Sequence, residues 1–200
     1  MPMASGFCAL FPIWGVPPLE INSLQALTGF GLNDGRSWHN GAMTKPRLPA
    51  FDPADLAESN ATSYPPKFKA INSKRWNRRL GDHAGLKNFG VNLTRIEPGG
   101  QTSARHAHTK QDEFILVMSG EVVLETNEGS QTIGPGMCAG FPAGCGNAHR
   151  FVNKTDKNAV ILVVGDRTPF DEVSYPDIDN HGKAGADGKY VFTKKDGTPH

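Results

Sequence analysis

Cysteine is scarce in this 200-residue sequence: Cys8, Cys138 and Cys145 are the only three, and none stands at Cys-x-x-Cys spacing. Three cysteines provide no disulfide framework, so we expect a protein of the reducing cytoplasm. No apolar run approaches the roughly 20 residues of a membrane span. The apolar N-terminal segment also lacks the basic start and the continuous apolar stretch of a signal peptide. These absences predict a protein with no membrane partner.

An excess of charge of either sign is also missing. Lysine and arginine total 21 against 20 aspartates and glutamates, a net charge of +1, so no global field favours nucleic acid or an anionic surface as partner. The one basic run, residues 67–79, surrounds Trp76. Such a run can contact nucleic acid, but a solvated face with the tryptophan packed inward is commoner, and we predict that. We therefore expect no nucleic-acid partner.

Turn-forming residues are abundant, with 23 glycines and 15 prolines. Between the turns lie short segments of strand character, and the segment 159–165 is apolar on both phases, as in a strand buried on both faces. Many short strands at this spacing are typical of a double-sheet jelly roll, an all-β fold. The strands are expected at 89–96, 101–108, 113–118, 121–126, 131–133, 137–141, 148–152 and 159–165.

The two ends differ from the middle in composition. Residues 1–42 are apolar and interrupted by proline and glycine, and Met43 opens a more ordinary N-terminus, so 1–42 is predicted to be a poorly ordered extension or a misassigned start. Five prolines between 44 and 66 predict an extended N-terminal arm over 43–80. The barrel is expected over 81–170, followed by a C-terminal tail over 171–200 that packs on the barrel or on a partner. Internal repeats are absent, which excludes a second barrel.

Histidines carry the strongest chemical signal. His106 and His108 stand two apart, so on a strand both imidazoles project from one face. Glu113 follows a four-residue connection that can return antiparallel, and His149 opens a later strand. Three imidazoles and one carboxylate are a ligand set suited to a divalent first-row metal. The alternative is that the two close histidines are merely exposed.

These residues form a known pattern. Gly100, His106, His108, Glu113 and Gly120 stand in the register of the first cupin motif, and the second motif is similar to Gly136, Pro142, Gly144, His149 and Asn153. One departure is that four residues separate Gly144 from His149, where two are usual. The chain from about residue 79 to 199 resembles single-domain bacterial cupins of unassigned reaction. The resemblance implies a double-stranded β-helix and a metal site of His106, His108, Glu113 and His149.

Two function classes follow. The first is a metal-dependent enzyme acting on a small, oxygen-rich, carboxylate- or hydroxyl-bearing molecule, with one divalent metal (iron, manganese, zinc or nickel) as cofactor. The resemblance allows oxygenase, decarboxylase, isomerase or lyase chemistry, and the fold does not choose among them. The second is a barrel that binds or senses a small molecule without converting it. One observation argues against the enzyme: apart from the ligand Glu113, no residue is identified as a general base. Cys145 is predicted to be small apolar filler.

A homodimer is the last expectation. Residues 113–118 carry Phe114, Leu116 and Met118 on the outward phase, a face that a monomer would have to cover or expose. The proline-rich arm is expected to reach across a two-fold axis rather than to fold back.

Overall fold

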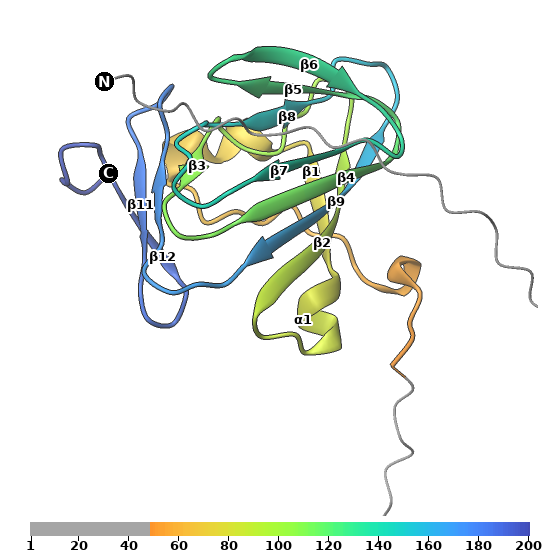
Figure 1. Ribbon diagram of the computed structural model, residues 1–200, viewed down its shortest axis with the longest axis horizontal. Helices are drawn as coiled ribbons and strands as arrows, with labels where there is room; N and C mark the ends of the chain where they lie inside the picture. Colours follow the sequence, from red (N-terminus) through yellow and green to blue (C-terminus); the bar gives the residue numbers. More distant parts are fainter. Residues whose placement is uncertain (1–48) are drawn as a thin grey trace, which may run out of the picture. The chain divides into compact units, whose positions relative to one another are not determined.

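The computed structural model describes residues 49–200 (Figure 1). The predictions for residues 1–42 and for Cys8 therefore lie outside the described residues. Three short helices are present in the described part, η1 (Pro53–Asp55), η2 (Pro66–Asn72) and α1 (Leu80–Ala84), and none of them is long and apolar enough to cross a membrane. The strands are β1 (Arg75–Arg79), β2 (Phe89–Ile96), β3 (Ala107–His108), β4 (Glu113–Ser119), β5 (Val122–Thr126), β6 (Gly129–Ile133), β7 (Cys138–Phe141), β8 (Arg150–Val152), β9 (Ala159–Asp166), β10 (Glu172–Ser174), β11 (His181–Ala184) and β12 (Tyr190–Thr193).

The strands form three antiparallel sheets. A five-stranded sheet has the order β1-β2-β9-β4-β7, a three-stranded sheet the order β6-β5-β8, and a four-stranded sheet the order β12-β11-β10-β3. In Figure 1 the three-stranded sheet lies above the five-stranded one, and β11 and β12 stand at the left end. The predicted all-β jelly-roll barrel is confirmed, because sheets face each other around one apolar interior.

The barrel core lies between the five- and three-stranded sheets. On β4 the inward phase carries Ile115 and Val117, each 1% exposed, while Phe114 on the other phase is 45% exposed. This alternation follows from the two-residue period of a strand, so one face of β4 packs inside and the other looks out. Ile161 of β9 is fully buried against the same cluster. The core is continued by Ile96, Val122, Leu124, Ile133, Ala139, Phe141, Phe151 and Ala159.

Two residues, Gly120 and Asn153, stabilise turns of the barrel. Gly120 has φ +73°, and a Cβ there would lie 2.6 Å from the carbonyl oxygen of Asn158, so only glycine fits. Asn153 is fully buried, and its amide donates to the carbonyl oxygens of Ile96 (2.9 Å) and Lys157 (2.7 Å). Asn153 therefore ties the connection between β8 and β9 to the end of β2.

The N-terminal arm folds back onto its own chain, and the expectation that it reaches away is wrong for its described part. Ser59 bridges Asn77 of β1, and Glu58 holds Arg95 of β2 at 2.7 Å. Tyr64 packs edge-on against Tyr175, with ring centroids 5.6 Å apart. The arm folds back because an aromatic partner, Tyr175, and a charged partner, Arg95, lie within its reach on the same chain.

The basic run contains a strand that the sequence analysis did not predict. Arg75 to Arg79 form β1, which pairs with all but the first residues of β2 and extends the five-stranded sheet. Basic residues have no strand preference of their own, so the pairing is decided by the open edge of β2.

The C-terminal segment forms a sheet of its own. β10, β11 and β12 pair in sequence, and β10 also pairs with β3, which carries His108. A second apolar cluster lies between this sheet and the arm, and it is aromatic where the barrel core is aliphatic. Its buried members are Tyr64, Ala104, Val173 and Tyr175, with Phe68, Ile71, Ile178, Tyr190 and Phe192 packed around them.

Candidate metal centre

The four predicted ligands come together at one end of the barrel. His106 and His149 face each other across an isolated antiparallel bridge, with mutual backbone hydrogen bonds of 3.0 and 2.8 Å. His108 belongs to β3, two residues beyond His106, and Glu113 is the first residue of β4. The turn between β3 and β4 thus brings the carboxylate back beside the imidazoles.

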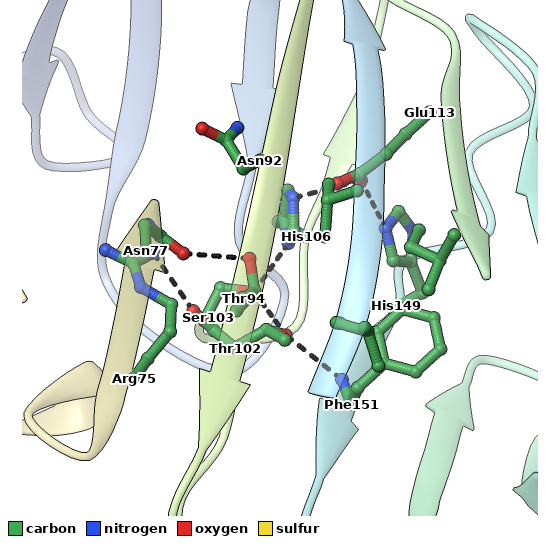
Figure 2. Close-up of a pocket in the computed structure, with 13 residues that line it drawn as sticks. Arg75, Asn77, Asn92, Thr94, Thr102, Ser103, His106, Glu113, His149 and Phe151 are labelled. Carbon is green, nitrogen blue, oxygen red and sulfur yellow. Dashed lines mark hydrogen bonds and ion pairs between the residues drawn. The ribbon is translucent and has the colours of Figure 1, made fainter. Parts of the chain in front are cut away.

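The side-chain atoms converge closely. One ligand atom each from His106, His108 and Glu113 lies within 4.8 Å of the others, a cluster that could hold a metal ion. Glu113 Oε2 lies 3.8 Å from His106 Nε2 and 2.7 Å from His149 Nε2 (Figure 2). His149 Nε2 therefore contacts the same carboxylate that would bind a metal.

In two of the rings, those of His106 and His108, hydrogen bonds fix which nitrogen faces the cluster. His108 Nδ1 lies 2.6 Å from Asp171 Oδ2, and His106 Nδ1 lies 3.1 Å from both Ser103 Oγ and the Ala104 carbonyl oxygen. An Nδ1–H that donates to such an acceptor leaves Nε2 with the lone pair. Both rings are therefore set to offer Nε2, the arrangement that outer hydrogen bonds give to metal-ligating histidines.

Asp171 is the anchor of His108 and is itself fully buried. Its Oδ1 accepts from the backbone N–H groups of Thr109 (3.0 Å) and Lys110 (2.7 Å), and its Oδ2 accepts from the Tyr190 hydroxyl (2.7 Å) as well as from His108. Burial alone would raise the pKa of the Asp171 carboxyl, but the hydrogen bonds from His108, Tyr190 and Lys110 outweigh it and lower the pKa. Asp171 thus stays a carboxylate behind the histidine.

His149 is held by packing instead. Its ring stacks on Phe141 with centroids 3.5 Å apart and planes 10° apart. Nδ1 is buried and has no hydrogen-bond partner among the described residues. The ring is fixed face-on by Phe141 and edge-on by the bond of Nε2 to Glu113.

The protonation of the cluster fits a divalent metal, which needs neutral imidazoles and an ionised carboxylate. Burial lowers the pKa of His106 to about 4, so its ring is neutral near pH 7. Burial alone would raise the pKa of the Glu113 carboxyl. The hydrogen bond from His149 and the electrostatic effect of the neighbouring imidazoles outweigh it and lower the pKa to about 2. The donor set of nitrogen and oxygen atoms suits a first-row metal.

Two cavities open from this cluster. The inner one, of about 210 Å³, is lined by His106, Glu113 and His149 on one side and by Arg75 and Asn77 of β1 on the other (Figure 2). The outer one, of about 530 Å³, has the size of a small-molecule pocket. The two share Arg75, Asn77, Ser103 and His106. Space for a small molecule therefore adjoins the candidate metal ligands.

The cluster does not include Cys145, Arg105 or Arg150. Cys145 is exposed, so the prediction that it fills an apolar space is wrong; the long loop before His149 carries it to the surface. Arg105 pairs with Asp177 at 2.8 Å, and Arg150 pairs with Glu125 at 2.6 Å. Neither arginine lines either of the two cavities described above.

Four residues near the site were not identified from the sequence: Arg75, Asn77, Arg79 and Asp171. The first three alternate along β1, so they share the face that lines the cavities, and Trp76 and Arg78 lie on the other. Their period of two in RWNRR was the available signal. Asp171 carried no such signal, because it stands 63 residues from His108 and the tertiary fold brings the two together.

Comparison with known families matches the barrel. Residues 92–165 match the cupin domain family. No curated protein sequence matches the chain.

Solved structures match a larger share of the chain. The chain is 45% identical to a sugar phosphate isomerase from a cupin superfamily of Silicibacter pomeroyi DSS-3, over 76% of this chain and 96% of that one, with a TM-score of 0.72. A proposed sugar phosphate isomerase from Acidithiobacillus ferrooxidans is 32% identical over 60% and 76% of the two chains, with a TM-score of 0.56. The polyketide cyclase RemF from Streptomyces resistomycificus, 22% identical over 58% and 78% with a TM-score of 0.50, shares the fold. The chain belongs to the cupin superfamily.

Proposed function

We propose that this protein is a metal-dependent enzyme that isomerises a small phosphorylated sugar. The observation that carries the proposal is the convergence of His106, His108, Glu113 and His149 beside two cavities, of which the outer one has small-molecule size. The relative from Silicibacter pomeroyi, with 45% identity, supports the reaction class. The four side chains would hold one divalent metal, which would act as a Lewis acid on the carbonyl and hydroxyl oxygens of the sugar.

Sugar isomerisation moves a proton between neighbouring carbons, so the cavity must contain a base. Glu113 is the one carboxylate among the described residues that line the two cavities. With a pKa of about 2 it is ionised near neutral pH and is therefore in the form that accepts a proton. We therefore assign proton transfer to Glu113, together with its place in the ligand set. Ile115, Ile161 and Val163 form the apolar wall that limits water around it.

The test is proton exchange and turnover. The purified full chain, loaded in turn with iron, manganese, zinc or nickel, is incubated with a panel of aldose and ketose phosphates in D₂O and followed by NMR. We expect one metal form to convert a sugar phosphate and to incorporate deuterium at the carbon next to the carbonyl. Glu113→Gln should lose exchange, whereas His181→Ala, whose ring pairs with Glu172 instead, should keep it.

The alternative is a cupin that binds the same kind of molecule without converting it. What favours it is that a single carboxylate would have to serve as metal ligand and base. If a sugar phosphate binds but no metal form shows turnover or deuterium incorporation, the protein is a binding cupin and not an isomerase.

We also propose that the protein is a homodimer through the outer face of the five-stranded sheet. Leu93 and Leu116 both stand opposite Leu162 in register, and Phe114 and Met118 are 45% and 52% exposed beside them. Soluble monomers rarely expose a contiguous apolar face. Light scattering should give about twice 21.6 kDa, and Phe114→Glu/Met118→Glu should halve it. A wild-type mass near 21.6 kDa would reject the dimer.

A cytoplasmic location is the last part of this proposal. Cys138 and Cys145 are both free in the structure, which suits a reducing compartment.

A further inference from the structure

The charge of the cavities is unbalanced on the side opposite the candidate metal ligands. Two guanidinium groups, Arg75 and Arg79, line the outer cavity, and no carboxylate of the described residues does. In the inner cavity Arg75 faces Glu113, whose charge belongs to the candidate metal centre. An occupant of the outer cavity therefore meets two guanidinium groups at β1 and no carboxylate among the described lining residues.

Arg75 differs from every other described arginine. Arg78, Arg79, Arg95, Arg105, Arg150 and Arg167 each pair with an aspartate or glutamate. Arg75 instead donates to two backbone carbonyl oxygens, those of Thr102 (3.2 Å) and Ala61 (3.3 Å), and its buried Nε has no partner. Two bonds of five possible donors leave most of its hydrogen-bonding capacity unused.

A guanidinium in this position is costly to the fold. Burial lowers the pKa of Arg75, and the charge of Arg79 lowers it further. A charge that is partly withdrawn from water and has no counter-ion destabilises a protein unless a partner arrives. Asn72, 2% exposed on the wall of the same outer cavity, also keeps its carbonyl oxygen Oδ1 without a partner. Unmet donors and acceptors on one cavity wall point to a missing polar ligand.

We propose that Arg75, with Arg79 beside it, binds the phosphate group of the substrate while the sugar extends to His106 and Glu113. This rests on the proposed function, since it assigns one end of a sugar phosphate to β1 and the other to the metal. The planar guanidinium fork matches two phosphate oxygens at once. His106 lines the same two cavities as Arg75, so one small molecule can reach both.

Calorimetric titration with inorganic phosphate tests the assignment without any turnover. The full chain as purified is compared with Arg75→Gln and with Arg78→Gln, a matched control from the same strand whose side chain pairs with Glu58 and lines neither cavity. We expect Arg75→Gln to weaken phosphate binding about tenfold or more, because one charged hydrogen-bonding partner is lost. Arg78→Gln should stay within about twofold. Equal affinity in wild type and Arg75→Gln would overturn the proposal.

Phosphate could also bind to the metal, and a second variant separates the two sites. His106→Ala/His108→Ala removes two proposed metal ligands and leaves Arg75 in place. Phosphate binding that persists in this variant supports the arginine site, and binding lost there but kept in Arg75→Gln overturns it. If Arg75→Gln does not fold, as judged by its melting curve, Arg79→Gln replaces it, because the Arg79 side chain is 64% exposed. An unchanged phosphate affinity in Arg79→Gln would then reject the proposal.

The chemical class of the anion is read from a parallel titration with acetate. Tighter binding of phosphate than of acetate supports a phosphate ester, and the reverse order would overturn that part of the assignment. Because none of these titrations involves conversion of a sugar, their result is independent of whether the protein is an isomerase. A protein that isomerises sugar phosphates but binds phosphate equally well without Arg75 would keep its function and lose this inference.

Discussion

The two sides of the candidate site are built in different ways. On the barrel side, the ligands His106, His108, Glu113 and His149 lie within 44 residues of sequence and rest on an aliphatic core. On the outer side, residues 61–79 and 171–192 meet around an aromatic cluster of tyrosines and phenylalanines. On the barrel side, strand alternation and a short turn place His106, His108 and Glu113 locally, and His149 joins them through its bridge to His106. The outer side exists only because two distant segments pack together.

This contrast predicts that substitutions on the barrel side abolish metal binding, whereas substitutions on the outer side only change the metal affinity. The largest expected effect is that of His106→Ala/His108→Ala. Metal should fall from about one ion per chain to background, because two of the proposed donors are gone. Elemental analysis of protein purified without added metal measures this, with His181→Ala as the control. Equal metal in wild type and the double variant would contradict the barrel-side assignment.

Asp171→Asn is the next largest. It replaces the carboxylate that orients His108 by an amide of the same shape, and such outer partners typically contribute about 10–100-fold to metal affinity. Competition with a chromophoric chelator measures the dissociation constant. The matched control is Asp177→Asn, which loses a surface pair with Arg105 instead. If both variants bind metal as wild type does, the outer side does not act on the metal.

Tyr190→Phe should have a smaller effect. The change removes one hydroxyl, which donates to Asp171 at 2.7 Å and reaches Gln111 at 3.1 Å. A hydrogen bond of this kind contributes about 0.5–1.5 kcal/mol to the free energy of unfolding, with more for a charged acceptor. Urea denaturation should show this loss, and Val191→Ala, at a position 68% exposed, should show almost none. An equal loss of unfolding free energy in the two variants would mean that the Tyr190 hydroxyl does not stabilise the protein through Asp171.

The smallest expected effect concerns pH and the arm. Hydrogen bonding to Arg95 lowers the pKa of Glu58 below its ordinary value. The resulting stability, about 1 kcal/mol, is complete above the unfolded pKa of about 4.3 and is lost as pH falls through the lower folded value. Wild type and Glu58→Gln should therefore differ in denaturation midpoint at pH 7 and converge only once the pH has fallen below the lowered folded pKa of Glu58. A difference that persists at low pH would mean that packing, not charge, joins the arm to β2.

The sequence alone determined the barrel and the identity of the proposed ligands. A strand alternates its side chains with a period of two, so an outward phase of Phe114, Leu116 and Met118 leaves Ile115 and Val117 for the interior, and both are 1% exposed. The same rule placed His106 and His108 on one face, and the short turn to Glu113 fixed the third donor. These inferences needed only neighbours within about ten residues.

Only the tertiary structure decided the rest. The alternation of RWNRR puts Arg75, Asn77 and Arg79 on one face, but nothing local said that the segment would pair with β2 or that this face would line the cavities. The arm folds back because Tyr64 finds Tyr175, and Asp171 meets His108 because β10 pairs with β3. Each of these depends on a partner about 60 or more residues away, or on an open sheet edge. The chain's own pattern therefore specified the proposed metal ligands, and long-range packing specified what surrounds them.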